Sequence, residues 1–389
     1  MGEPDVAAIA ARARQAGRLG LDTEFMPEGR YRPLLCLVQV VVEEDVWVLD
    51  PLAGFDPTAL AEVLADPGVE IVVHAGRQDV AILRREWGTD VTTVFDTQVA
   101  AGFAGFSAQA GYSGLLHDVL RIRLPKTASF TRWDARPLTE EQLRYARGDV
   151  EHLLPLADDI QGRLEARGRL DWAREECRAI AQATDERDPD EVWRRLPRAT
   201  SLDPRERAVA RELAAWRERT AAREDRPVGA VLRDPTIAEL AKRQPAGRRE
   251  LAQIRGVNPD VVRRRGDDIL AAIQRGRAAQ PIRLDEGERL ATESQDGPVI
   301  ALAEALVRAR AQEAGLAYEL IAARADLAPV VVTSRRGDAE PDVRTLRGWR
   351  RELVGAELLE LLAGRRALRV GDGGRIDVGS DANERQPRL

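Results

Sequence analysis

The sequence predicts an α/β fold in its N-terminal part, with a mixed sheet flanked by helices, followed by one or two all-α modules. Two observations lead to this prediction. Before residue 200, short apolar runs with strand period come first and then alternate with amphipathic helical runs. After residue 200 the apolar residues recur with helical period only. A chain of 389 residues is also long enough for two or three domains.

Composition and charge narrow the class of protein. Hydrophobic residues make up 44% of the chain but aromatic residues only 4%, so the cores must be aliphatic. Residues 1–200 carry a net charge of −10 and residues 201–280 carry +6. An acidic domain beside a basic module suits a metal-holding enzyme domain joined to a nucleic-acid-binding module. The net charge of −6 argues against a protein that binds nucleic acid along its whole surface.

Membrane, secreted and zinc proteins are disfavoured. No run approaches the roughly 18 consecutive apolar residues of a membrane span, and the acidic N-terminus lacks a signal-peptide pattern. The two cysteines and three histidines are too scattered for a zinc site. We therefore expect a cytoplasmic protein with no membrane partner, and we expect it to be a monomer.

The first domain is expected over residues 1–185. Three strands with short connections predict an antiparallel meander over 18–25, 34–42 and 45–49. Helices are expected over 6–16, 57–65, 77–87, 106–122 and 163–182, and short strands over 69–73 and 92–95. Residues 123–137 lack periodicity and predict a loop. A capping box at Thr139–Gln142 predicts a helix that runs to about Ile160.

The Pro, Gly and charge content divides residues 186–389 into linkers, domains and a tail. Residues 186–200 are a predicted linker with a short helical piece, and residues 201–280 a helical domain. A second helical domain of similar rhythm is predicted over 299–370. The polar, glycine-rich tail at 371–389 is expected to be disordered.

Asp22 and Glu24 stand out in the first strand. They lie two residues apart, so both side chains point to one face of the sheet. Two carboxylates this close repel each other unless protons or cations lie between them. A divalent cation would resolve the repulsion, since hard cations prefer oxygen ligands. A solvated strand edge is the alternative, and these two residues alone leave both open.

Further along the chain, Asp79 opens a predicted helix, and Tyr145 and Asp149 are one helical turn apart on a shared face. With Asp22 and Glu24 they form an ordered set of four acids and one phenol. The sequence motifs that contain or flank them are Leu-Asp-Thr-Glu-Phe at 21–25, His-Ala-Gly-Arg-Gln-Asp at 74–79, Phe-Asp-Thr-Gln at 95–98, Leu-Pro-Lys at 124–126, Arg-Pro-Leu-Thr at 136–139 and Tyr-Ala-Arg-Gly-Asp-Val at 145–150. This set resembles ribonuclease D, of the DEDD 3′→5′ exonucleases with a tyrosine in the last motif. Residues 201–280 resemble the helical HRDC domain that follows the nuclease in that family, and 299–370 resemble a diverged second copy.

The resemblance implies a ribonuclease-H-like fold and removal of nucleoside 5′-monophosphates from RNA 3′ ends, such as those of tRNA precursors. It implies two divalent cations, Mg²⁺ or Mn²⁺, of the kind that all-oxygen ligands hold. Asp22 would bridge the two ions, and Glu24 and Asp149 would hold the ion beside the nucleophile. Asp79 would ligate the other ion, directly or through water. Tyr145 would orient the attacking water, because a phenol with a pKa near about 10 is a poor free base.

Substrate contacts are weaker predictions, each with a plain structural alternative. Phe25 could stack on the terminal base or belong to the core, and His74 could contact substrate or close an apolar strand. Loop charges could touch phosphate or remain solvated. The candidates are Phe25, His74, Lys126, Arg132 and Arg136 in the first domain and Arg248, Arg249, Arg263 and Arg264 in the helical domain. Asp96 is predicted to be a helix N-cap and not a ligand.

Two rival functions stay open at this point. One is a DNA-directed 3′→5′ exonuclease, since the acids do not distinguish the sugar. The other is an RNA-binding protein with an inactive nuclease fold, which the presence of all five motif residues disfavours.

Overall fold

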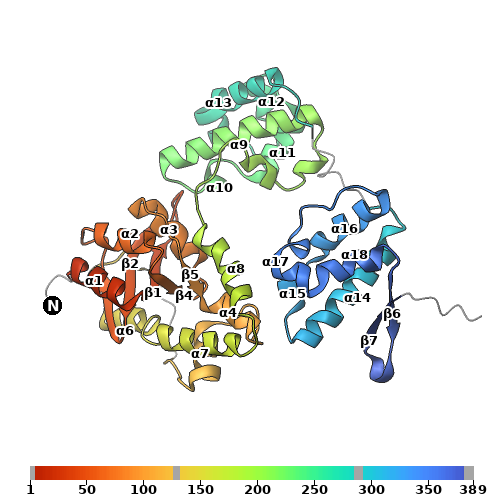
Figure 1. The fold of residues 1–389 in the computed structure, drawn as a ribbon. Helices are drawn as coiled ribbons and strands as arrows, with labels where there is room; N and C mark the ends of the chain where they lie inside the picture. Colours follow the sequence, from red (N-terminus) through yellow and green to blue (C-terminus); the bar gives the residue numbers. More distant parts are fainter. Residues whose placement is uncertain (1–4, 126–131, 284–291, 381–389) are drawn as a thin grey trace, which may run out of the picture.

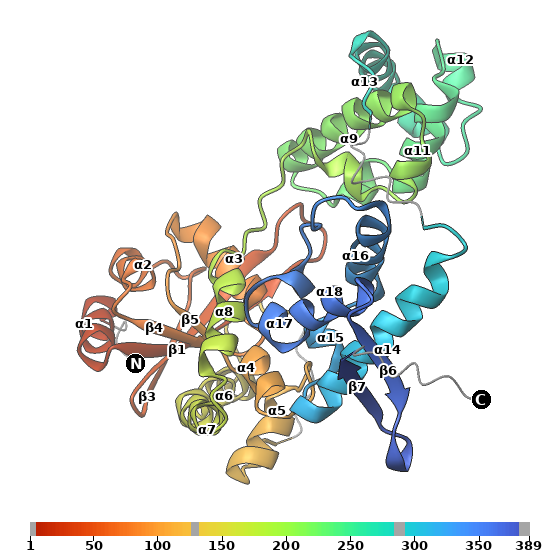
Figure 2. The same cartoon turned by 45° about the vertical axis from the view of Figure 1, so that its right-hand side comes forward.

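The computed structural model describes residues 5–125, 132–283 and 292–380. Within these ranges the chain forms an α/β domain and two helical modules (Figure 1). The first helical module follows the α/β domain in sequence, and the second packs beside helices α4 and α8 of the α/β domain (Figure 2). No helix in these ranges is both long enough and apolar enough to cross a lipid bilayer.

A five-stranded mixed sheet forms the centre of the α/β domain. Its strand order is β3-β2-β1-β4-β5, with β1 in the middle. β1, β2 and β3 pair antiparallel as the predicted meander, while β4 and β5 run parallel to β1. The strands are β1 Arg18–Met26, β2 Leu34–Val42, β3 Asp45–Leu49, β4 Glu70–Val73 and β5 Val94–Asp96.

Helices cover both faces of this sheet, which is why β2 is buried at almost every position. Helices α1 to α3 lie on one face, and α4 and α7 lie on the other. The helices are α1 Val6–Ala16, α2 Thr58–Ala65, α3 Arg77–Trp87, α4 Thr97–Phe103, α5 Tyr112–Leu115, α6 Glu140–Gly148, α7 Leu153–Glu165 and α8 Leu170–Ala181. The mixed sheet flanked by helices that the sequence predicts is therefore confirmed.

Two of the predicted helices are wrong in extent. The helix expected over 106–122 is a short α5 followed by a π-helical turn at Leu116–Leu120. The helix expected from Thr139 to Ile160 is two helices, with residues 149–152 forming turns between them. The capping box at Thr139 is present as predicted. Asp149 is the C-terminal cap of α6, and its backbone N–H still donates to the Tyr145 carbonyl at 3.2 Å.

The first helical module has its own apolar core. Its longest helices, α9 and α13, approach closely, since a Cβ at Gly276 would collide with the backbone of Val209. Trp193, on a 3₁₀ turn at Val192–Arg195, is buried in this core, so the predicted linker packs against the module. The helices are α9 Pro204–Glu224, α10 Val228–Val231, α11 Asp234–Arg243, α12 Arg248–Leu251 and α13 Pro259–Ala278.

The second helical module ends in a β-hairpin. We expected a disordered tail from Gly371, and for residues 371–380 this is wrong. The glycines at 373 and 374 have positive φ and form the turn between β6 and β7. Residues 381–389 lie outside the described part of the chain. The elements are α14 Asp296–Ala314, α15 Tyr318–Ile321, α16 Arg324–Arg336, α17 Gly348–Arg350, α18 Ala356–Leu362, β6 Arg366–Val370 and β7 Ile376–Ser380.

One apolar core is shared by the second module and the α/β domain. Trp349 of α17 stacks on Trp172 of α8 at 5.2 Å between ring centroids and meets Phe103 of α4 edge-on at 5.0 Å. Glu176 accepts a hydrogen bond from the Trp349 indole at 3.0 Å and pairs with Arg350 at 2.5 and 2.8 Å. The second module is therefore docked on the α/β domain by apolar burial and by a charged pair.

Candidate active site

Three carboxylates converge where β1 meets the break between α6 and α7. Asp22, Glu24 and Asp149 each offer an oxygen, and these oxygens lie within 4.8 Å of one another. The strand period places Asp22 and Glu24 on one face, and the helix break presents Asp149 to them. The register between β1 and β2 shifts directly after Glu24, which changes the direction of the strand at the site. An all-carboxylate donor set of this size fits a hard divalent cation.

Asp79 lies in the first turn of α3 and is buried beside this cluster. Its negative charge is among the causes that raise the pKa of Asp22, second only to burial. The hydroxyl of Thr23, the residue between Asp22 and Glu24, donates a hydrogen bond to the Asp79 carboxylate. That bond orients Asp79 relative to the strand. The sequence pattern did not single out Thr23, although it lies inside the motif.

Burial raises the pKa of all three converging acids, and the charges of neighbouring acids raise those of Asp22 and Glu24 further. The pKa of Asp22 lies well above its usual range because of burial and the charges of Asp79, Asp149 and Glu24. Burial, with the charges of Asp149 and Asp79, raises the pKa of Glu24 to about 8. Burial raises the pKa of Asp149 to about 7, although a hydrogen bond from Tyr145 opposes the shift. Without cations the site therefore holds protons at neutral pH, and cations would replace them.

The replacement of protons by cations at the site predicts that the stability of the protein depends on pH. In the metal-free protein the folded state binds more protons than the unfolded state between about pH 4.5 and 8, because the folded pKa values are raised. The site's contribution to stability should therefore fall as the pH rises through this window. We expect added Mn²⁺ to raise the melting temperature by only about 1 °C at pH 6 but by about 5 °C at pH 8. Calorimetry with and without Mn²⁺ measures this difference, and a gain that does not change with pH would contradict the assignment.

Two tyrosines lie at the cluster. Burial and then the charges of Asp149, Glu24 and Asp22 raise the pKa of Tyr145, so its phenol stays neutral. Burial also raises the pKa of Tyr112, and the charges of Asp149 and Asp22 raise it further. The Tyr112 ring packs at 5.4 Å from the His74 ring. Tyr112 was not predicted, because a lone tyrosine at the start of a short helix carries no pattern.

The predicted substrate residues of the first domain are mostly engaged in structural contacts. Phe25 is half-buried against the core beneath α1 to α3. His74 contacts the Thr97 hydroxyl through Nδ1 at 2.9 Å. Arg136 pairs with Asp50 at 2.6 Å and donates to the Cys36 carbonyl at 3.1 Å, so it anchors the loop after Trp133. Arg132 is exposed and pairs with Asp134, and Lys126 lies outside the described residues. Their substrate roles stay predictions.

The four arginines of the first helical module lie apart from the acids, on α12 and α13. These helices lie on the side of the module that faces away from the α/β domain (Figure 1). Arg248 pairs with Asp267 at 2.6 Å and Arg263 with Asp260 at 2.5 Å. Arg249 and Arg264 are exposed. Asp96, as predicted, caps α4 by accepting from the amides of Gln98 and Val99.

The chain is similar to known proteins in sequence and in fold. A family model described as 3′-5′ exonuclease matches residues 2–165, and one described as HRDC domain matches residues 206–273. The crystal structure of Escherichia coli RNase D, titled an exoribonuclease involved in structured RNA processing, superposes with a TM-score of 0.82 at 27% identity. The alignment covers 94% of this chain and 99% of that one. The fold and site thus define a 3′–5′ exonuclease of the ribonuclease-H-like class with an HRDC domain.

Sequence relatives identify the particular family. Ribonuclease D of Gluconacetobacter diazotrophicus is 37% identical over 380 residues, covering 96% of this chain and 94% of the relative. Ribonuclease D of Acidiphilium cryptum is 37% identical over 378 residues with the same coverage. The chain belongs to the ribonuclease D family and is a 3′–5′ exoribonuclease.

Proposed function

We propose that this enzyme removes nucleotides one at a time from the 3′ ends of structured RNA, such as tRNA precursors, by two-metal hydrolysis. The single observation that carries the proposal is the convergence of Asp22, Glu24 and Asp149 within 4.8 Å, with buried Asp79 beside them. These four acids come from β1, α3 and the end of α6, so their meeting depends on the whole fold.

The carboxylates supply the charge that such a site needs. Asp22, Glu24 and Asp149 would hold divalent cations, and Asp79, oriented by Thr23, would complete the set directly or through water. Bound there, two cations would lower the pKa of an attacking water and offset the charge on the leaving oxygen. The raised pKa values favour protonated carboxyl groups when no cation is bound, which limits the cost of holding these acids together.

Tyr145 would position the water. It lies one turn before Asp149, and its raised pKa keeps the hydroxyl neutral and able to donate or accept a hydrogen bond. Its ring lies 5.9 Å from that of Trp133, which is buried and limits where the phenol can move. We assign Tyr145 to orientation and not to proton abstraction, because only the phenolate could accept the proton and a raised pKa leaves almost none of it at neutral pH.

Digestion of matched substrates tests the proposal. We expect the full chain with Mg²⁺ or Mn²⁺ to shorten a hairpin RNA with a single-stranded 3′ extension stepwise and to release nucleoside 5′-monophosphates. The same sequence made as DNA should be degraded at least about tenfold more slowly. Gel analysis of the ladder and chromatography of the products give both results.

Two results would contradict the proposal, each in favour of a named rival. Faster degradation of the DNA would favour a DNA-directed exonuclease. Binding of the RNA without cleavage, in either metal, would favour an inactive RNA-binding protein. Blocking the RNA 3′ hydroxyl with a phosphate serves as the control for polarity, because a 3′ exonuclease should then be slowed and an endonuclease should not.

A further inference from the structure

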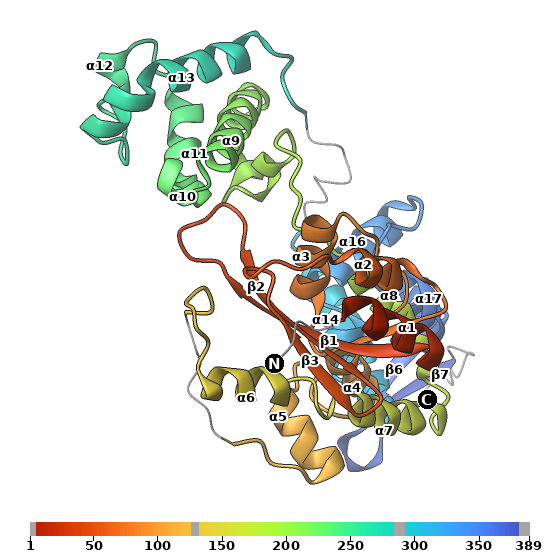
Figure 3. The same ribbon diagram turned by 90° about the vertical axis from the view of Figure 1, so that its left-hand side faces the viewer.

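The turn between β1 and β2, residues 27–33, reaches from the catalytic strand to the first helical module (Figure 3). β1 carries Asp22 and Glu24 and ends at Met26, so this turn begins only three residues after Glu24. The turn residues are mostly polar and exposed at its start, yet Tyr31 packs against the core of the module. A direct connection therefore exists between the acids and the module.

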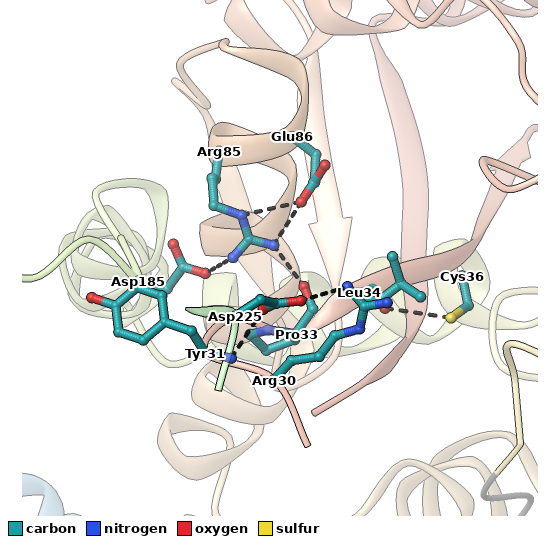
Figure 4. Close-up of polar contacts among 9 residues, drawn as sticks. All are labelled: Arg30, Tyr31, Pro33, Leu34, Cys36, Arg85, Glu86, Asp185 and Asp225. Atoms are coloured by element: carbon teal, nitrogen blue, oxygen red, sulfur yellow. Dashed lines mark hydrogen bonds and ion pairs between the residues drawn. The ribbon is translucent and has the colours of Figure 1, made fainter. Parts of the chain in front are cut away.

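Three polar contacts fasten this turn to α9. The Tyr31 hydroxyl donates to Glu218 Oε1 at 2.9 Å, and the Tyr31 backbone N–H donates to Asp225 Oδ1 at 3.2 Å. Arg30 pairs with the other oxygen of Asp225 at 3.0 Å. Figure 4 shows Asp225 between the Arg30 guanidinium and the Tyr31 amide. Asp225 caps the end of α9 in the left-handed conformation, and its backbone N–H bonds carbonyls of the last turn, so the helix end fixes the residue that carries this carboxylate.

The environment of Glu218 indicates that the first helical module is formed to contact the 27–33 turn. Its side chain is only 2% exposed, although a buried carboxylate is costly unless it is hydrogen-bonded. Its partners are Tyr31, from the α/β domain, and Arg187, from the linker, at 3.4 Å. A module swung away from the turn would lose the phenol donor and leave this acid with one weak partner. The docked position is therefore the one in which the buried Glu218 carboxylate keeps both of its hydrogen-bond partners.

Arg85 connects the same turn to the helix that carries Asp79. It lies on α3, donates to the Pro33 carbonyl at 2.8 Å and pairs with Asp185, directly before the linker. Figure 4 shows its guanidinium between Asp185, Glu86 and Pro33. Both acid-bearing elements, β1 and α3, are thus joined to the turn and to the chain that leads into the module.

We propose that the 27–33 turn is a specificity-determining contact, in which Tyr31 acts as a positioning residue that holds the first helical module in place relative to Asp22 and Glu24. The inference rests on the proposed function. An RNA long enough to touch both the acids and the module binds more tightly when their spacing is fixed. The entropic cost of ordering the module relative to the acids is then already met in the free enzyme. An RNA that occupies the acids alone gains nothing from it.

Kinetics on two substrates test this with the full-length Tyr31→Phe variant. The substrates are a tetranucleotide and a hairpin RNA with a single-stranded 3′ extension, both in Mn²⁺. We expect the KM for the hairpin to rise about tenfold at unchanged kcat, the factor that loss of one hydrogen bond to a charged group corresponds to. The kcat/KM for the tetranucleotide should stay within about twofold of the wild type.

Two further variants separate positioning from general damage. Tyr318→Phe is the matched control, since it removes a phenol hydroxyl in the second module and should change neither substrate. In Glu218→Gln the amide oxygen still accepts from Tyr31, so adding Tyr31→Phe to it should raise the hairpin KM by less than Tyr31→Phe does alone. Trypsin should also cut the linker near Arg187 faster in Tyr31→Phe, which reports the release of the module directly.

The outcomes divide cleanly. A rise in hairpin KM with an unchanged tetranucleotide, together with faster cutting of the linker, supports the inference. Equal effects on both substrates, or no effect on either, would overturn it while leaving the exoribonuclease intact. A wild-type enzyme that cleaved neither RNA would refute the proposed function and this inference together.

Discussion

Replacing Asp149 with asparagine should lower the rate of RNA hydrolysis by about a thousandfold or more, equivalent to about 4 kcal/mol of barrier. The substitution keeps the shape of the side chain but removes one of three converging negative charges. Because the carboxylate of Asp149 is buried and its charge raises the pKa of Asp22 and Glu24, the same change relieves burial of charge and repulsion in the metal-free protein. We therefore expect lost activity together with an equal or higher melting temperature. Single-turnover cleavage and calorimetry measure the two effects.

Asp171→Asn is the matched control, since it makes the same chemical change at an exposed acid of α8. It should leave the rate within about twofold of the wild type. RNA affinity of Asp149→Asn, measured by titration without cleavage, should stay close to that of the wild type in Ca²⁺. Activity of Asp149→Asn above about a tenth of the wild type would remove this acid from the mechanism.

Replacing Trp349 with alanine should destabilise the α/β domain and the second module together, by about 3–5 kcal/mol. The indole is 2% exposed between Phe103 and Trp172, and its N–H bonds Glu176. Its loss leaves a cavity in a core that both units share. Urea unfolding followed by hydrogen exchange at α4 and α8 should show lower protection there as well as in α17.

Trp349→Phe separates the ring from the N–H. It keeps an aromatic ring against Trp172 but leaves Glu176 with Arg350 as its partner. We expect a loss of about 1–2 kcal/mol, which corresponds to one hydrogen bond and a small change in volume. If Trp349→Ala left the amides of α4 and α8 as protected as in the wild type, the two units would not be coupled as the shared core implies.

Local patterns predicted much of the α/β domain. Helices α1 and α3 have the predicted bounds, and Asp96 and Thr139 cap helices as expected. These features depend on residues within a few positions of one another, so local rules suffice. The acids were predicted differently, from the order of motifs that resembles ribonuclease D, because no local rule joins residues this far apart.

The predictions that were wrong concern features that depend on contacts distant in sequence or that have only weak local signals. The stretch from Asp149 to His152 has neither Pro nor Gly, and Gly148, the last residue of α6, is a weak signal because single glycines also occur inside helices. The glycines after Val370 indicated flexibility, whereas two of them form a hairpin turn. Arg136 pairs with Asp50, 86 positions earlier, and a loop arginine gives no local sign of such a partner. Side-chain partners across the fold decide whether an arginine is available to a phosphate.

The shared core has a consequence for how the chain is made. The apolar face of α4 and α8 is covered by α17, which leaves the ribosome more than 160 residues after α8. Until then the nascent nuclease presents Phe103 and Trp172 to solvent, while the intervening HRDC module, with a core of its own, can already fold. A nascent chain that stalls before Trp349 should therefore be a preferred client of chaperones that bind exposed aromatic surface.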